Sequence, residues 1–187
     1  MWHKLLNDKT LYELLLKIDV DLWTRAREAG CRYCGGPLHT AHYPRKPRGG
    51  PAKLPPGYDL RLSLCCGSDG CRRRTTPASV RFLGRRVYLA AMLVLVCAMQ
   101  LGPTRVRVAK LHELFGVSRW TVCRWRRWWL DAFGETTFWQ VNRARLRSQP
   151  DGHTLPASLL ACFVDDTLRE RLVALLRFLS PLTVPGS

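Results

Sequence analysis

Five cysteines between residues 31 and 71 constrain this chain more than any other feature. Two form the pair CRYC, as Cys31 and Cys34, and three lie in the stretch CCGSDGC, as Cys65, Cys66 and Cys71. A closed tetrahedral zinc site needs four ligands, and thiolates are typical ones in structural sites. The segment around these cysteines is rich in glycine and proline and poor in apolar periodicity, so it cannot fold on apolar burial alone. We therefore predict a zinc ribbon, in which the metal replaces a hydrophobic core.

The face of one strand decides which cysteines are predicted to bind the metal. Cys65 and Cys66 are adjacent and would point to opposite sides of a strand, so only one of them should be a ligand. Leu60, Leu62 and Leu64 share their face with Cys66, and we expect this apolar face to pack toward the metal. The predicted zinc ligands are Cys31, Cys34, Cys66 and Cys71.

Other donors stay open as alternatives. Cys65 takes the place of Cys66 if the face assignment is wrong, and His39 or His42 becomes a ligand if one cysteine is not used. Four thiolates would leave no open coordination position, so we predict a structural rather than a catalytic site. The remaining cysteines are interpreted as small core residues of predicted helices: Cys97, Cys123 and Cys162.

The net charge of the chain is strongly positive, and arginine supplies most of it. Its 187 residues include 30 Lys+Arg and 14 Asp+Glu, which gives a formal net charge of +16 and a pI near 10.2. Such a field attracts polyanions, and guanidinium groups suit bidentate contacts to phosphate and guanine. Because eight cysteines occur without a recognisable signal peptide, we expect a reducing, cytoplasmic location in association with the nucleoid.

An unbroken apolar run, VYLAAMLVLVCAM, covers residues 87–99. A membrane span needs about 18–20 apolar residues, and runs of about 10–14 are typical of buried core helices. We therefore predict a core helix from Val80 to Leu101, ended by Gly102 and Pro103, and no membrane partner.

The periodicity of the remaining chain predicts a mainly α protein with a small β zinc ribbon and a helical bundle that contains a helix-turn-helix. A capping box, Thr10 with Glu13, is expected to begin the first long helix. This helix is expected over residues 10–29. Further helices are expected over residues 106–115, 118–133, 137–147, 155–164 and 167–179. The predicted domains are an N-terminal helix (1–30), the zinc ribbon (31–75), a helical domain (76–135) and the C-terminal helices (136–187).

The stretch GVSRWTVCRWRRWW, residues 116–129, follows the short helical segment VAKLHELF. A helix, a glycine turn and a Ser-capped second helix are typical of a helix-turn-helix, although a basic surface helix with aromatic packing has the same composition. The second helix would place Arg119, Trp120, Thr121 and Arg124 in the major groove. The positions expected to be buried are Leu111, Leu114, Val117, Val122 and Trp125.

The predicted DNA-binding residues of this segment are Ser118, Arg119, Trp120, Thr121, Arg124, Arg126 and Arg127. Arg126 and Arg127 lie further along the helix and suit phosphates rather than bases. Other arginines would extend the phosphate-contacting face: Arg72, Arg73, Arg74, Arg81, Arg85, Arg105 and Arg107.

The order of these parts resembles the front end of insertion-sequence (DDE-type) transposases. The matching stretches are CRYC, CCGSDGCRRRTTP, the apolar segment 80–101 and GVSRWTVCRW, so the resemblance covers roughly residues 31–129. It implies a zinc ribbon and a helix-turn-helix that recognises DNA. Such transposases continue into an RNase-H-like domain with three metal-binding carboxylates. The acids after Trp129 lie in short helical pieces without an alternating strand pattern, so we expect no such catalytic domain here.

We therefore expect a zinc-containing DNA-binding protein of a bacterial mobile element, which recognises element ends or assists or regulates a separate transposase. The expected partners are double-stranded DNA, a transposase or other protein of the same element, and a second copy of the chain. The alternatives are a transcription regulator, a protein-assembly module built on the ribbon and the C-terminal helices, and an RNA-binding protein. The chain has no P-loop, HExxH or Ser-His-Asp arrangement, so no enzyme is predicted.

Overall fold

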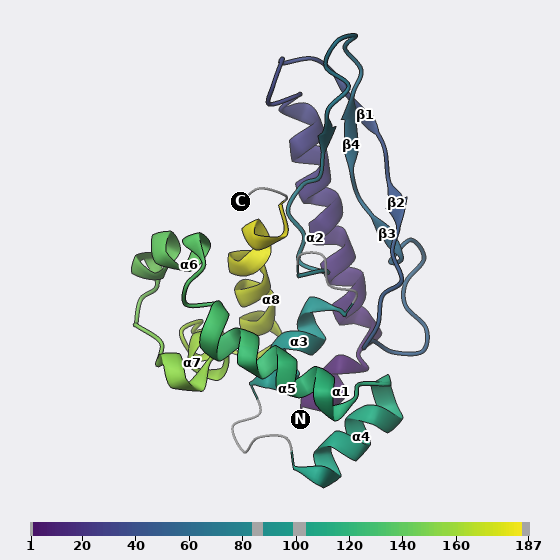
Figure 1. Ribbon diagram of the computed structural model, residues 1–187. Helices are drawn as coiled ribbons and strands as arrows, with labels where there is room; N and C mark the ends of the chain where they lie inside the picture. Colours follow the sequence, from purple (N-terminus) through teal and green to yellow (C-terminus); the bar gives the residue numbers. More distant parts are fainter. Residues whose placement is uncertain (1, 84–87, 99–103, 185–187) are drawn as a thin grey trace.

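A computed structural model describes residues 2–83, 88–98 and 104–184. The chain is mainly α-helical with two small antiparallel sheets, as predicted at this coarse level. Figure 1 shows the long helix α2 beside a narrow ribbon of strands, with the other helices gathered around the first half of α2. The helices are α1 (Trp2–Leu6), α2 (Lys9–Glu28), α3 (Ala90–Cys97), α4 (Arg105–Phe115), α5 (Arg119–Arg127), α6 (Thr137–Asn142), α7 (Ala157–Ala161) and α8 (Leu168–Leu179).

The N-terminus of α2 is capped by Asp8, so the prediction of a capping box at Thr10 is wrong. The Asp8 carboxylate accepts the amide of Thr10 at 2.9 Å and also the Thr10 hydroxyl at 2.8 Å. A carboxylate is stabilised by the positive end of the helix dipole, which favours Asp8 over a neutral hydroxyl as the cap.

The strands lie in the segment that carries the clustered cysteines, as the turn-rich sequence indicates. One sheet has the order β1–β4–β5 and the other pairs β2 with β3. In the first sheet Leu38 lies opposite Cys66 and Thr40 opposite Leu64. The strands are β1 (Leu38–Thr40), β2 (Tyr43–Pro44), β3 (Leu60–Arg61), β4 (Leu64–Cys66) and β5 (Arg74–Thr75).

The apolar run forms a shorter helix than predicted, because the prediction began it at Val80 and α3 begins at Ala90. Residues 80–83 are not helical, and Phe82 forms an isolated antiparallel bridge with Leu89. The predicted helix stop at residues 102–103 and Arg85 lie outside the described residues. Among the described residues, no helix has the length and apolar character needed to cross a membrane.

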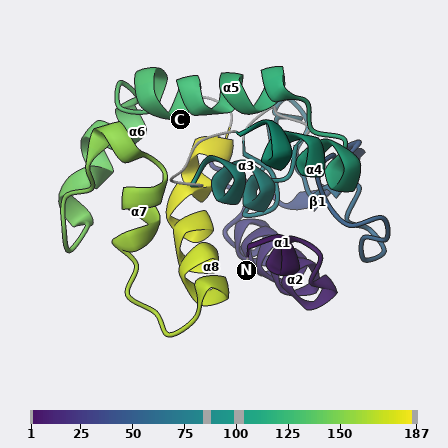
Figure 2. The same cartoon turned by 90° about the horizontal axis from the view of Figure 1, so that it is seen from below.

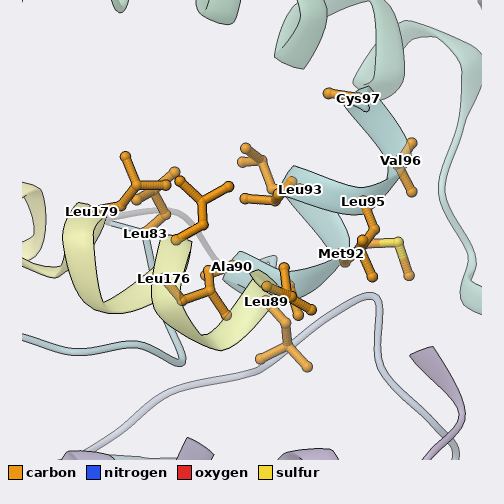
Figure 3. Close-up of a cluster of buried hydrophobic side chains, with 14 of the residues drawn as sticks. Leu83, Leu89, Ala90, Met92, Leu93, Leu95, Val96, Cys97, Leu176 and Leu179 are labelled. Carbon is orange, nitrogen blue, oxygen red and sulfur yellow. The ribbon is translucent and has the colours of Figure 1, made fainter. Parts of the chain in front are cut away.

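The main hydrophobic core surrounds α3, all eight residues of which are buried. Figure 3 shows Leu176 and Leu179 of α8 beside Ala90, Leu93 and Leu83. Viewed from below, α5 lies across one side of α3 and the N-terminal helices lie across the other (Figure 2). A short helix that is apolar on every side must be enclosed on every side, and α3 meets this requirement.

The C-terminal helices complete this core. Thr167 caps α8 in a capping box with Glu170, as both side chains bond the other residue's backbone amide. The apolar face of α8 is buried within the chain through Leu172, Leu175, Leu176 and Leu179. This face is therefore not free to bind another protein, which removes one support for the protein-assembly alternative.

A buried ion pair joins α2 to the segment before α3. Arg81 Nε donates to Asp19 Oδ2 at 2.8 Å, and both side chains are almost fully buried. The Asp19 carboxylate also accepts the amide of Val80, and the Arg81 guanidinium also donates to the carbonyls of Tyr58 and Leu60. The prediction that Arg81 contacts phosphate is wrong, because its guanidinium is enclosed and fully engaged inside the protein.

Candidate metal centre and candidate nucleic-acid interface

Four cysteine sulfurs meet at the end of the ribbon that lies beside the C-terminus of α2. The sulfurs of Cys31, Cys34, Cys66 and Cys71 all lie within 4.8 Å of one another. Cys31 Sγ is 3.7 Å from Cys71 Sγ, and Cys34 Sγ is 3.5 Å from Cys66 Sγ. A tetrahedral zinc ion with Zn–S bonds of about 2.3 Å requires sulfurs about 3.8 Å apart, so the cluster has dimensions that fit this ion.

The first pair of sulfurs is held by a tight loop after α2. The Cys31 amide donates to the Gly36 carbonyl at 2.9 Å, and the Gly35 amide donates to the Cys31 carbonyl at 2.7 Å. Gly35 has φ of +71°, a left-handed conformation that glycine adopts without a steric penalty. This turn directs backbone amides toward the sulfurs, as the CxxC-Gly-Gly sequence indicates.

The second pair of sulfurs comes from the end of β4 and the turn after it. The Ser68 amide donates to Cys66 Sγ at 3.4 Å, and the Cys71 amide donates to the Ser68 carbonyl. Below the cluster, Leu38 and Leu64 form a small apolar group with Trp23 of α2. This group is separate from the main core, so the cysteine end of the ribbon has little apolar material to stabilise it.

The thiols of the cluster titrate as a coupled group. The amide of Tyr33 lowers the pKa of Cys31, and the amide of Gly36 lowers the pKa of Cys34. The amide of Arg73 lowers the pKa of Cys71, but burial and the three neighbouring sulfurs raise it more strongly, to about 12. Without a cation, burial and hydrogen bonds to the neighbouring sulfurs therefore keep the Cys71 thiol protonated at neutral pH.

The alternative ligands lie outside this cluster. Cys65 points away from it, and its thiol donates to the Arg72 carbonyl at 3.4 Å. His42 Nδ1 accepts the amide of Ser63 at 3.2 Å. Among the described residues, the group of potential metal ligands does not include His39.

Both faces of the strand that carries Cys66 are enclosed, whereas the prediction of Cys66 as a ligand requires only one enclosed face. Leu64 and Cys66 are buried as expected, but Ser63 and Arg61 on the opposite face are buried as well. Arg61 donates to the Pro77 carbonyl, and its burial lowers its pKa. Cys66 joins the cluster because of its position at the end of β4, opposite Leu38, rather than because only one face is enclosed.

The helices α4 and α5 are joined by a tight glycine turn. Gly116 has φ of +64° and its amide donates to the His112 carbonyl at 2.9 Å, which ends α4. Ser118 then caps α5, because its hydroxyl accepts the Thr121 amide at 3.3 Å. Val117 in the turn is fully buried, so the turn is fixed to the core.

One face of α5 packs against the core. The predicted buried residues Val122 and Trp125 are buried, and so is Leu111 of α4. Leu114 was predicted to be buried but is 40% exposed, because Phe115 lies one turn after Leu111 and takes the inward position instead.

The helical phase of α5 corrects two further predictions. Thr121 was expected in the major groove, but it is 8% exposed and lies on the core-facing side with Val122 and Trp125. Cys123 was expected in the core, but it is exposed. Residues 121 and 125 are four apart and share a face, which directs residue 123 to the opposite side.

The outward face of α5 is basic and aromatic. Trp120 is 86% exposed, and the side chains of Arg119, Arg124 and Arg127 are exposed around it. Arg126 differs, because it is half-buried and donates to the Cys97 carbonyl at 3.4 Å. It lines a cavity of about 410 Å³ between α5 and α7.

The contact of Tyr33 with Arg32 and Arg73 beside the cysteine cluster was not predicted, although Arg73 was expected on a phosphate-contacting face. Tyr33 contacts two guanidinium groups, with its ring centroid 4.8 Å from Arg32 Cζ and 4.4 Å from Arg73 Cζ. The only signal in the sequence is the presence of arginines next to Cys31 and Cys71, and their convergence on one ring depends on the fold.

Comparisons with protein-family models, with curated proteins and with solved structures gave no match to this chain. What the protein does is therefore inferred from its own residues and their geometry.

Proposed function

We propose that this chain is a zinc-containing protein that reads DNA sequence. In this proposal the cysteine cluster is the structural zinc site of a zinc ribbon, and α4 and α5 form a helix-turn-helix with α5 as the recognition helix. The observation that carries the proposal is the outward face of α5, where an exposed tryptophan lies among three exposed arginines on a helix whose other face is fixed in the core.

The chemistry of the donor set supports zinc as the ion. Four thiolates are soft ligands, which favour Zn²⁺ or an iron–sulfur cluster over Mg²⁺ or Ca²⁺. Two sulfur–sulfur distances of 3.5 and 3.7 Å fit a single tetrahedral ion. Bound zinc would hold the two cysteine turns together, and four protein ligands would leave no position for a substrate.

The electrostatics of α5 support DNA as its ligand. The first turn of α5 contains no acidic residue, so the positive end of its dipole is not neutralised locally. Arginine donates two parallel hydrogen bonds to guanine, and an aromatic ring contacts the methyl group of thymine. Trp120 is 86% exposed, so contact with a base would remove much of its apolar surface from water.

The resemblance to insertion-sequence transposases supports a role for this DNA-binding function in a mobile element. The chain would recognise element ends, or assist or regulate a separate transposase, and it would perform no catalysis. A transcription regulator uses the same interface and remains the second candidate. A transposase gene and terminal inverted repeats beside the coding sequence would distinguish the first role from the second.

Arg119→Ala and Arg124→Ala are each expected to reduce discrimination between the preferred DNA site and altered sites by about 1–3 kcal/mol, because each removes a bidentate base contact. The measurement is selection of bound duplexes from a random pool, followed by titration of the best site and its single-base variants. Arg127→Ala is the matched control, and it should weaken binding to all duplexes alike because Arg127 would contact phosphate. Unchanged site preference in both Arg119→Ala and Arg124→Ala would refute the assignment of α5.

Zinc binding is expected to release protons and to strengthen as the pH rises. Because the Cys71 pKa is raised to about 12, its thiol keeps its proton at pH 7 in the metal-free protein and must lose it on ligation. Zinc affinity should therefore fall as the pH is lowered from about 8 to about 6. Titration of the reduced, metal-free protein with Zn²⁺ in a weakly buffered dye solution measures the released protons. Binding with no proton release would contradict ligation by four thiolates.

A further inference from the structure

The cysteine end of the ribbon gathers exposed arginines that lie far from α5. Two come from the last turn of α2, one from the first cysteine turn, and three follow the second. These ribbon-tip arginines are Arg25, Arg27, Arg32, Arg72, Arg73 and Arg74, and all are exposed. Arg32 and Arg74, distant in sequence, line the same hollow of about 350 Å³. The fold therefore concentrates positive charge at this end of the molecule.

Aromatic contacts hold several of these guanidinium groups without neutralising them. Arg32 and Arg73 both contact the ring of Tyr33, which is 46% exposed. The Cζ of Arg74 lies 5.5 Å from the ring of Tyr43. A guanidinium against an aromatic face keeps its full charge and loses little entropy when it binds an anion, because its position is already restricted.

Nearby acids do not balance this charge. Among the described residues, Arg72 is the one ribbon-tip arginine in an ion pair, with Asp69 at 2.6 Å. Asp21, one helical turn before Arg25, and Glu28 are the other carboxylates close by in the sequence. Zn²⁺ with four thiolates would carry two further negative charges, which leaves the six arginines in excess by one charge. Neutralising the metal centre therefore does not account for all of them.

The two basic surfaces lie toward opposite ends of α2 (Figure 1). The ribbon tip lies at the C-terminal end of α2, whereas α4 and α5 lie near its N-terminal end (Figure 1). The 20 residues of α2 span about 30 Å at 1.5 Å per residue. The length of α2 is thus close to the ~34 Å groove repeat of one turn of B-DNA.

We propose that the ribbon-tip arginines form a second contact with the DNA backbone, about one helical turn from the bases that α5 reads on the same duplex. This inference rests on the proposed function. A single copy of the chain would then contact the duplex at two places, through α5 and through the ribbon tip. The tip would supply affinity and fix the position of the protein, and α5 would supply sequence preference.

The test is the double variant Arg32→Ala with Arg73→Ala, made in the full-length, zinc-loaded protein. Removing one arginine–phosphate contact should lower the slope of log affinity against log salt by about 0.9, so the double variant should lower it by about 2. The protected region in hydroxyl-radical footprinting should shorten at one end, and the selected sequence motif should not change. Arg32→Lys with Arg73→Lys keeps both charges and should retain most of the slope.

Two controls distinguish failure of the ribbon-tip contact from failure of the proposed function. Arg171→Ala with Arg177→Ala removes the same net charge from exposed positions on α8 and should leave the slope unchanged. Zinc content and the thermal midpoint show whether each variant is folded. An unchanged slope and footprint in the folded tip variant would overturn the inference alone, while wild-type protein that selects no motif would overturn the proposed function. A lower slope with a full-length footprint would refute contact with the same duplex.

Discussion

Cys66→Ser is expected to abolish zinc binding and to unfold the ribbon, whereas the neighbouring Cys65→Ser is expected to preserve both. Cys66 Sγ lies in the four-sulfur cluster, 3.5 Å from Cys34 Sγ. Structural zinc contributes about 10–16 kcal/mol in small zinc-binding folds. The apolar group beneath the cluster is too small to replace that free energy.

Cys65→Ser is a matched control for Cys66→Ser, because the two cysteines are adjacent and undergo the same substitution. Cys65 is partly exposed and donates to a backbone carbonyl, and a serine hydroxyl keeps that donor. Zinc content by mass spectrometry under native conditions and hydrogen exchange of residues 31–75 measure the two outcomes. The ligand assignment would be wrong if Cys65→Ser lost the metal and Cys66→Ser retained it.

Asp19→Ala is expected to destabilise the whole protein by about 3–5 kcal/mol, because it leaves the buried guanidinium of Arg81 without its counter-ion. The same change removes the acceptor for the Val80 amide and the Ser79 hydroxyl. At about 2–4 °C per kcal/mol for a chain of this size, the thermal midpoint should fall by roughly 10 °C. Chemical denaturation followed by tryptophan fluorescence measures the change in the free energy of unfolding.

A double-mutant cycle with Arg81→Met tests the cause. If the loss in Asp19→Ala comes from an uncompensated charge, adding Arg81→Met should recover part of it, since methionine fills similar space without charge. The recovery should be incomplete, because Arg81 also satisfies the carbonyls of Tyr58 and Leu60. Strictly additive losses in the two single variants would show that the ion pair does not couple them.

These two predictions differ in how far the sequence anticipates them. The clustering of the four cysteines is predicted from their spacing. The glycines after Cys34 and before Cys71 allow tight turns, and such turns depend only on neighbouring residues. The ion pair between Asp19 and Arg81 has no local signal. Its partners are 62 residues apart, and the apolar residues around Arg81 predict a helix that the structure does not form there.

In the α4–α5 pair, too, some features are predicted from neighbouring residues and others depend on tertiary packing. Gly116 and Ser118 end one helix and begin the next through bonds to residues three or four positions away, so the sequence predicts the turn correctly. The errors at Leu114, Thr121 and Cys123 concern which side of each helix meets α3 and the core. A shift of one residue moves a side chain by about 100° around a helix, and only the packed neighbours decide that rotation.

The sequence by itself determined the mainly α character, the turns that bring paired cysteines together, the Ser118 cap of α5, and the excess of positive charge. These depend on residues a few positions apart, whose conformations are limited by local sterics and hydrogen bonds. Only the tertiary structure decided which helix faces meet the core, the burial of Arg81, and the gathering of arginines at the ribbon tip. Each of these depends on which distant segments pack together, and packing is a property of the whole chain.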